Sequence, residues 1–185
     1  MSSARDRLLN AADRSFYANG INATGIDALV REAGVAKMSL YNNFASKDEL
    51  VTAYLRRRHL EWLALLDARL TKAATASARV LAVFDAYLDH ARVALGTGYR
   101  GCGLLNGAAE LPTGHPGREV VREQKAEVRR LLTRLCEEAG VADPEALSDH
   151  LYLLVEGGAV SAGLEETDAW LRRARSRAAA LLAQA

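Results

Sequence analysis

Side chains that can contact a nucleic acid gather in residues 37–43 of this 185-residue chain. The helix face that they would form comprises Lys37, Met38, Ser39, Tyr41, Asn42 and Asn43. An asparagine amide can pair with both N6 and N7 of an adenine, so Ser39, Asn42 and Asn43 are candidates for contacts with base edges. Lys37 and Lys47 are candidates for contacts with phosphates. For any one of these polar residues, the simpler interpretation is a hydrated helix face.

Two short predicted helices position these residues. The first begins near Thr24, whose side chain we expect to cap the first turn, and Gly34 ends it because glycine tolerates the left-handed conformation. The second spans residues 37–43, with Leu40 and Phe44 on its inward side. Two helices joined by a short glycine-containing turn form a helix-turn-helix, whose second helix enters the major groove of DNA. The N–H groups near Thr24 are a further candidate for phosphate contacts.

A long helix is predicted to follow directly. Ser46 and Glu49 have the spacing of a capping box, which starts a helix at Lys47. The helical pattern continues to residue 71, and at 1.5 Å per residue the helix is roughly 37 Å long. A helix of this length can link two bodies and transmit a movement from one to the other.

The same residues resemble the N-terminal DNA-binding domain of the TetR family of one-component transcriptional regulators. The resemblance rests on Thr24, Ile26, Leu29, Ala33-Gly34-Val35-Ala36-Lys37, Ser39-Leu40-Tyr41, Phe44, Ser46-Lys47 and Glu49-Leu50. It covers roughly the first fifty residues, and it is specific because matching residues recur at many fixed offsets. It implies that Tyr41 contacts the DNA backbone. The family commonly has other residue types at the positions of Met38, Asn42 and Asn43, so the operator sequence is not predicted.

The composition is typical of a soluble globular protein. The formal net charge is +1 and charged residues make up 25% of the chain, which excludes the strongly basic proteins that coat nucleic acids. Cys102 and Cys136 are too few and too far apart for a zinc site, and neither His115 nor Glu110 has a second ligand at a suitable spacing. Because no signal peptide or long apolar run is evident, we expect a cytoplasmic protein. Because no ligand spacing suits a metal, we expect neither a metal nor another cofactor.

Helical periodicity along the whole chain predicts an all-α fold. Besides the helices above, we expect helices at residues 4–17, 79–95, 102–111, 118–139, from 144 through the small-residue run 157–163, and after 168, with a loop at 96–103. The resemblance implies nine helices in two domains. Residues 1–46 would form the helix-turn-helix DNA-binding domain and residues 47–185 the ligand-binding and dimerisation domain, with the helix 47–71 linking the two.

The resemblance also implies a homodimer in which the last two helices of each subunit pair across a two-fold axis. Small residues in the run 157–163 allow another helix to approach closely, and Trp170 begins an apolar stripe in the last helix. The expected interface residues are Leu154, Gly158, Ala162, Trp170, Ala174, Ala178 and Leu181. The alternative is that these small residues face the core of their own subunit.

A largely apolar effector would bind in a cavity of the C-terminal domain. The candidate lining residues are Trp62, Leu66, Phe84, Tyr87, Cys102, Leu105, Asn106, Glu110, Val128, Tyr152 and Glu156, each of which could equally be ordinary core. Cys102 lies beside Arg100 at the start of a short helix, an arrangement that favours the thiolate. A thiol-based redox or electrophile sensor is therefore one alternative, and an inert packed cysteine is the simpler one.

These features favour a sequence-specific transcriptional regulator, a repressor that leaves a palindromic double-stranded DNA operator when a small molecule binds. An enzyme is disfavoured because no paired carboxylates, nucleophile–base pair or phosphate-binding loop stands at motif spacing. A ligand-independent architectural DNA-binding protein is a further alternative. An activator would carry the same sequence features as a repressor.

Overall fold

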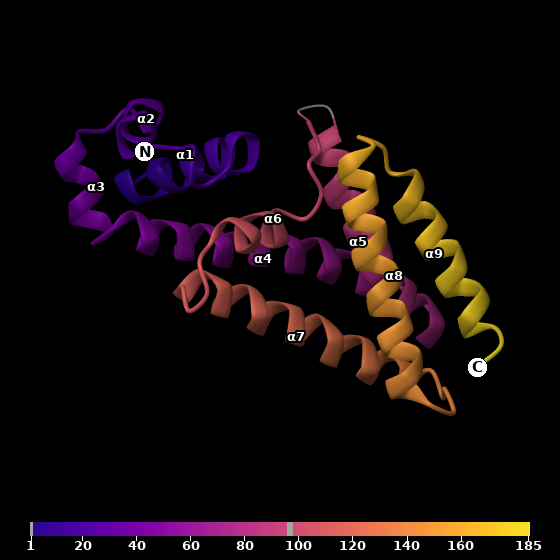
Figure 1. The fold of residues 1–185 in the computed structure, drawn as a ribbon. Coiled ribbons are helices and arrows are strands. Elements are labelled where there is room, and N and C mark those ends of the chain that lie inside the picture. The colour runs from indigo at the N-terminus through magenta and orange to yellow at the C-terminus, as the bar shows by residue number, and fades with distance from the viewer. Residues whose placement is uncertain (1, 96–97) are drawn as a thin grey trace. The chain divides into compact units, whose positions relative to one another are not determined.

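The computed structural model describes residues 2–95 and 98–185, and within them the chain forms nine α-helices and no strand (Figure 1). The helices are α1 (Ala4–Asn19), α2 (Ile26–Ala33), α3 (Lys37–Asn43), α4 (Lys47–Leu70), α5 (Ala76–Leu95), α6 (Gly103–Glu110), α7 (Pro116–Glu138), α8 (Pro144–Leu164) and α9 (Ala169–Leu182). The predicted all-α fold is confirmed. The first two residues of the predicted loop 96–103 lie outside the described residues.

Several predicted helix ends are confirmed by their hydrogen bonds. Gly34 has φ of 62° and its N–H donates to the carbonyl groups of the last turn of α2. The Asp143 carboxylate accepts from the N–H of Ala146 at 3.1 Å and so caps α8. The Ser46 hydroxyl accepts from the N–H of Glu49 at 3.1 Å, which starts α4 as expected. Local capping signals therefore determine these boundaries.

Four predicted helix starts differ from the structure. α7 begins at Pro116 rather than at residue 118 and α6 at Gly103 rather than at residue 102, and the other two differences have a clear cause. Thr24 does not cap α2, because the N-cap residue is Gly25, which has no side chain to donate or accept. The Thr24 hydroxyl instead donates to the carbonyl of Gly20 at 2.7 Å. The helix predicted to begin at residue 79 begins at Ala76, because the Thr75 hydroxyl accepts from the N–H of Ala78 at 3.1 Å. Thr75, three residues before Ala78 in the sequence, is the N-cap signal that the prediction overlooked.

The described chain divides into two compact units. The first contains residues up to His59 together with Gly103–Glu123, and the second contains Leu60–Cys102 and Gln124–Ala185. α6 therefore groups with α1, α2 and α3 in the first unit, whereas the sequence suggests a functional boundary between residues 46 and 47. That functional division stays a prediction.

The first unit has an apolar core behind α3. Leu40 and Phe44 are 0% and 1% exposed, which confirms that they anchor α3 inward. Phe16 of α1 packs edge-on against Tyr54 of α4, with ring centroids 5.4 Å apart. The α6 residue Glu110 binds the loop after α1, where its carboxylate accepts from the backbone N–H of Asn22 at 2.9 Å. Glu110, a candidate ligand contact in the sequence, is therefore a structural anchor of the first unit.

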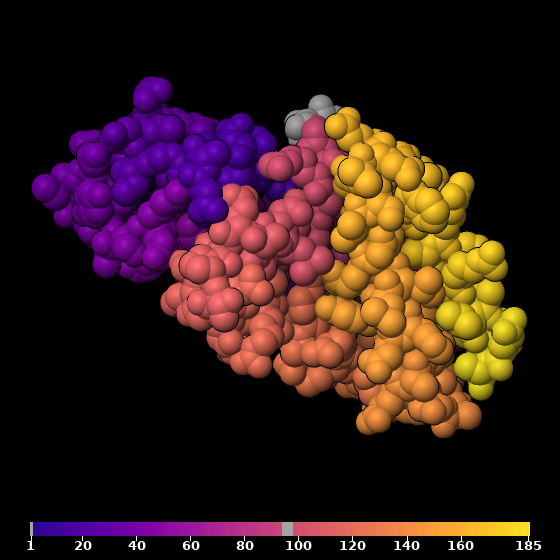
Figure 2. All heavy atoms as spheres, in the orientation of Figure 1, coloured from indigo at the N-terminus to yellow at the C-terminus, as the bar shows by residue number. Residues whose placement is uncertain are grey.

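The second unit is built around a core contributed by α4, α5, α7, α8 and α9. α8 and α9 pack along each other (Figure 2), and a Cβ on Gly158 would lie 3.1 Å from the Cβ of Ala174. The side chains of Ala162 and Ala178 are 0% exposed in the single chain. The prediction of a dimer contact is therefore wrong for Ala162 and Ala178, which face their own core.

The described residues include no helix with the length and apolar character required to cross a bilayer. They also include no cluster of three or more histidine, cysteine or carboxylate side chains that could hold a metal ion.

Candidate nucleic-acid interface and ligand region

α3 presents a polar face with two large exposed side chains. Met38 is 68% exposed and Tyr41 is 44% exposed, while Leu40 on the opposite side is fully buried. Asn42 is also exposed, and its side chain makes no hydrogen bond within residues 2–95 and 98–185. Ser39 is half-buried at the edge of this face. Among the three predicted base contacts, Asn42 is the one that is both exposed and without a hydrogen bond in the described part of the chain.

Three other predicted contact residues already have partners inside the first unit. The Asn43 amide donates to the Ser39 carbonyl at 2.7 Å, and the Lys47 ammonium donates to the Ile21 carbonyl at 2.6 Å. Thr24 is only 4% exposed. These side chains brace the helix-turn-helix from within, so they are weaker candidates for external contacts than Asn42.

Lys37 opens α3 and pairs with Asp27 of α2. Their side chains are 2.9 Å apart and both are largely exposed. The hydrogen bond from Lys37 to the Asp27 carboxylate raises the pKa of Lys37, so its ammonium stays charged near neutral pH. An exposed ion pair is weak in water, and a phosphate can compete for the lysine. Lys37 can therefore exchange Asp27 for a nucleic-acid backbone.

The N-terminus of α2 leaves its first backbone N–H groups without a side-chain cap. Gly25 is the N-cap residue and is exposed, and apart from its chain neighbours no described atom lies within 4 Å of the place where a Cβ would stand. Backbone N–H groups at a helix N-terminus attract anions because the helix dipole adds to their hydrogen bonding. This open helix start can accept a phosphate beside Lys37, which pairs with Asp27 in the first turn of α2.

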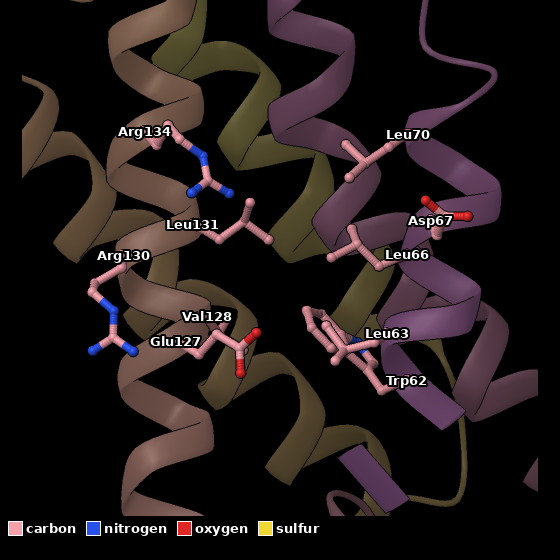
Figure 3. A pocket seen from close by; sticks show the side chains of 10 residues that line it. All are labelled: Trp62, Leu63, Leu66, Asp67, Leu70, Glu127, Val128, Arg130, Leu131 and Arg134. Carbon is pink, nitrogen blue, oxygen red and sulfur yellow. The ribbon is translucent and has the colours of Figure 1, made fainter. Parts of the chain in front are cut away.

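A groove in the second unit lies between the latter parts of α4 and α7 (Figure 3). Its volume is about 390 Å³, and its lining comprises Trp62, Leu63, Leu66, Asp67, Leu70, Glu127, Val128, Arg130, Leu131 and Arg134. Trp62, Leu66 and Val128 are among the residues that the sequence predicts. The others were missed, although the four-residue spacing of Trp62, Leu66 and Leu70 marks one side of α4.

A buried polar cluster of Tyr87, Lys125 and Glu156 packs against Trp62. The Trp62 ring packs edge-on against Tyr87 at 5.3 Å between centroids. The Tyr87 hydroxyl donates to Glu156 at 2.9 Å, and the Lys125 ammonium donates to the same carboxylate at 2.5 Å. Two of the predicted ligand residues, Tyr87 and Glu156, are thus joined by Lys125, which the sequence did not single out.

Burial controls the charge states in this cluster. Burial raises the pKa of Tyr87 well above its ordinary value, so its hydroxyl keeps its proton. Burial alone would lower the pKa of Lys125, but the nearby Cys102, Tyr87 and Glu156 side chains hold that pKa well above its ordinary value. The ammonium of Lys125 is therefore retained inside the unit.

The remaining ligand candidates are dispersed. Phe84 is 0% exposed and belongs to the core, and Tyr152 lies under the guanidinium of Arg129, 5.6 Å from its ring centroid. Leu105 and Asn106 are on α6 in the first unit and do not line the groove. Cys102 is a half-buried free thiol.

A second groove follows the outer side of α8 and α9. It encloses about 790 Å³ and is lined by Leu153, Leu154, Gly157, Gly158, Ser161, Trp170, Arg173, Ala174, Ser176, Arg177 and Ala180. Leu153 is 67% exposed and Trp170 is 37% exposed. Of the predicted dimer contacts, Leu154, Gly158, Trp170 and Ala174 line this groove. Leu181 is half-buried and lines a smaller adjoining hollow with Leu153 and Leu154.

An all-α chain with an outward-facing second helix in a helix-turn-helix defines a class of DNA-binding proteins. The sequence model described as bacterial regulatory proteins, tetR family, matches residues 8–54. A TetR-family transcriptional regulator from Streptomyces coelicolor is 31% identical to this chain with a TM-score of 0.90, and the alignment covers 98% of this chain and 95% of that one. The chain belongs to the TetR family of transcriptional regulators.

Two curated relatives match about a third of this chain. The transcriptional activator FasR of Mycolicibacterium smegmatis is 45% identical over 53 residues, which are 29% of this chain and 24% of that protein. The transcriptional repressor KstR2 of Mycobacterium tuberculosis is 40% identical over 63 residues, 34% of this chain and 31% of that protein. This chain thus covers about a quarter to a third of the length of these curated relatives. One of the two is an activator and the other is a repressor.

Proposed function

We propose that this chain is a homodimeric repressor that binds a palindromic operator through α3 and leaves it when a small molecule fills the second unit. The observation that carries this proposal is the outward face of α3, on which the Asn42 amide has no hydrogen-bond partner among the described residues. In this proposal residues 1–46 bind DNA, residues 47–185 bind the ligand and the second subunit, and α4 links them. Because its target is chromosomal DNA, the protein would act in the cytoplasm.

The proposed contacts with DNA are of two kinds, phosphate contacts that position the domain and base contacts that recognise the sequence. Lys37, Tyr41 and the open N-terminus of α2 would hold phosphates and orient the domain. Asn42, with Ser39 beside it, would meet base edges in the major groove. The apolar Met38 side chain is suited to the methyl group of a thymine. A dimer would place two such helices about one helical turn of DNA apart, which requires a palindromic site.

Asn42→Ala is expected to weaken binding to the specific operator about tenfold, because a bidentate amide–base contact contributes about 1–3 kcal/mol of discrimination. Binding to unrelated DNA should change little, since phosphate contacts supply it. Fluorescence anisotropy at a fixed salt concentration measures both. Asn43→Ala is the matched control, because its amide already donates to the Ser39 carbonyl. Equal losses for the two variants would argue against Asn42 as the base-reading residue.

The groove on α8 and α9 is the proposed dimer face. Its exposed apolar residues would be covered by the same surface of a second subunit, as a two-fold interface requires. Leu153→Glu should raise the dimer dissociation constant at least about tenfold, because it places a charge in a desolvated contact. Val93→Glu is the control, since Val93 is 79% exposed on α5 and does not line this groove. In sedimentation velocity we expect Leu153→Glu to dissociate and Val93→Glu to stay dimeric. If both variants dissociate, or neither does, the groove is not the dimer face.

Release from DNA would follow from preferential ligand binding to a subunit arrangement that does not fit the operator. Moving the population from almost fully bound to almost fully released requires a difference in ligand affinity of about 5.5 kcal/mol between the two states. The α4–α7 groove and the buried cluster behind Trp62 are the proposed place of binding. The matching relatives give no specific support to sensing through Cys102.

An electrophoretic mobility shift with the intergenic DNA beside the gene is the direct test of the whole proposal. We expect a retarded band that is lost when unlabelled copies of the same palindrome are added. Absence of retardation across low and moderate salt would contradict DNA binding by this chain. A promoter fusion would then separate repression from activation.

A further inference from the structure

The α4–α7 groove carries fixed charge as well as apolar surface. Its volume of about 390 Å³ lies within the range of about 300–1,000 Å³ typical of small-molecule pockets. Leu66 and Leu131 face the space between the helices, and Trp62 closes one end (Figure 3). These side chains offer an apolar surface to a ligand, and the charged side chains decide which ligand can use it.

Charged side chains lie on both helices of the groove. Glu127 lies near Trp62, whereas Arg134 comes seven residues later on α7, which is two turns or about 10 Å. Figure 3 shows Arg134 reaching from α7 toward the space beside Leu131. Arg134 thus lies toward the Leu70 end of the groove and Glu127 toward the Trp62 end, with Arg130 and Asp67 between them.

The guanidinium groups of Arg130 and Arg134 are available to a ligand. Arg130 and Arg134 are exposed, and among residues 2–95 and 98–185 neither side chain has an ion pair or a hydrogen bond. Other arginines of this unit are engaged, as Arg69 is with Asp89 and Arg175 with Asp85. A guanidinium without a partner beside apolar surface is suited to a carboxylate, which it can bind through two parallel hydrogen bonds.

We propose that the effector in this groove is an amphiphilic monocarboxylate. Its carboxylate binds Arg134, with Arg130 one turn away, and its apolar body lies along Leu66 and Leu131 toward Trp62. The carboxylates of Asp67 and Glu127 repel a second negative charge, which selects a monocarboxylate over a dicarboxylate. This inference rests on the proposed function, because it assigns the ligand class for the second unit.

The chain has two tryptophans, so Trp170→Phe leaves Trp62 as the only indole and a direct reporter of the groove. Octanoate, octanol and octylamine, each below its aggregation concentration, all contain eight carbon atoms and differ in the charge of the head group. We expect octanoate to change the Trp62 emission and to bind about tenfold more tightly than octanol, with octylamine weakest.

Arginine substitutions in the same background test the head-group contact. Arg134→Gln should weaken octanoate binding about tenfold and leave octanol binding unchanged, with a smaller effect from Arg130→Gln. Arg122→Gln is the matched control, since Arg122 lies on α7 outside the groove and pairs with Glu119. Equal affinities for octanoate and octanol, tighter binding of octylamine, or an unchanged octanoate affinity in Arg134→Gln would each overturn the proposal.

A mobility shift in the presence of octanoate separates this inference from the proposed function. If octanoate binds through Arg134 while the operator stays bound, the ligand class stands and release by a ligand in this groove fails. If another compound releases the operator while octanoate leaves Trp62 emission unchanged, the proposed function stands and the monocarboxylate assignment is overturned.

Discussion

Lys125→Met is expected to lower the free energy of unfolding by about 3–5 kcal/mol, the usual cost of removing one partner of a buried ion pair. Lys125 is 7% exposed, and its ammonium lies 2.5 Å from the Glu156 carboxylate. Methionine fills much of the same volume but leaves that carboxylate buried without a compensating charge. The second oxygen of Glu156 already has no hydrogen-bond partner among the described residues, so the cluster has no spare donor to replace the lysine.

Urea denaturation followed by circular dichroism measures this loss. The double variant Lys125→Met/Glu156→Leu removes both charges and should recover most of the stability, because an apolar pair avoids the desolvation cost. Arg122→Met is the control on the same helix, and we expect little change because its pair with Glu119 is exposed. A loss under about 1 kcal/mol in Lys125→Met would mean that water screens the pair.

Gly163→Ala is expected to destabilise the protein by about 2–3 kcal/mol through overpacking. A Cβ on Gly163 would lie 2.5 Å from the Cα of Gly101 and 2.6 Å from the carbonyl carbon of Arg100. Both are backbone atoms, so they cannot move aside as the end of a flexible side chain can. The loop before α6 and the end of α8 approach this closely because neither glycine has a side chain.

Gly157→Ala in the same helix is expected to change stability in the opposite direction. Apart from its chain neighbours and the adjacent backbone of α8, no described atom lies within 4 Å of the place where its Cβ would stand, so alanine would add helix propensity of about 0.5–1 kcal/mol without a clash. Thermal unfolding at one protein concentration compares the two variants, with the oligomeric state checked because Gly157 lines the proposed dimer face. Equal stability of Gly163→Ala and the parent would show that the loop does not pack against α8.

The helix-turn-helix could be predicted nearly residue by residue because its signals are local. Gly34 stops a helix by its own conformation, and Leu40 and Phe44 are four residues apart on whatever helix contains them. The prediction for Thr24 is wrong because threonine is also able to donate to a carbonyl, and the choice depends on how α1 ends. Asn43 and Lys47 look like DNA contacts in the sequence, yet each already donates to a nearby carbonyl group.

The second unit was less predictable because its functional residues come from distant parts of the chain. Lys125 and Glu156 are 31 residues apart, and a lysine in a helix pattern is ordinarily an exposed one. The small residues of α8 predict a dimer surface, but Ala162 faces its own core and Gly163 faces a loop. Periodicity identifies an inward face without identifying the element that covers it.

The sequence by itself therefore determined the all-α fold, most helix ends and the polar face of α3, since caps and helical spacing act over a few residues. The tertiary structure decided which polar groups have no partner among the described residues, as with Asn42 and Arg134, and which are occupied, as with Lys47 and Lys125. Those assignments depend on which atoms packing brings within hydrogen-bond distance, and neighbours in sequence do not specify them.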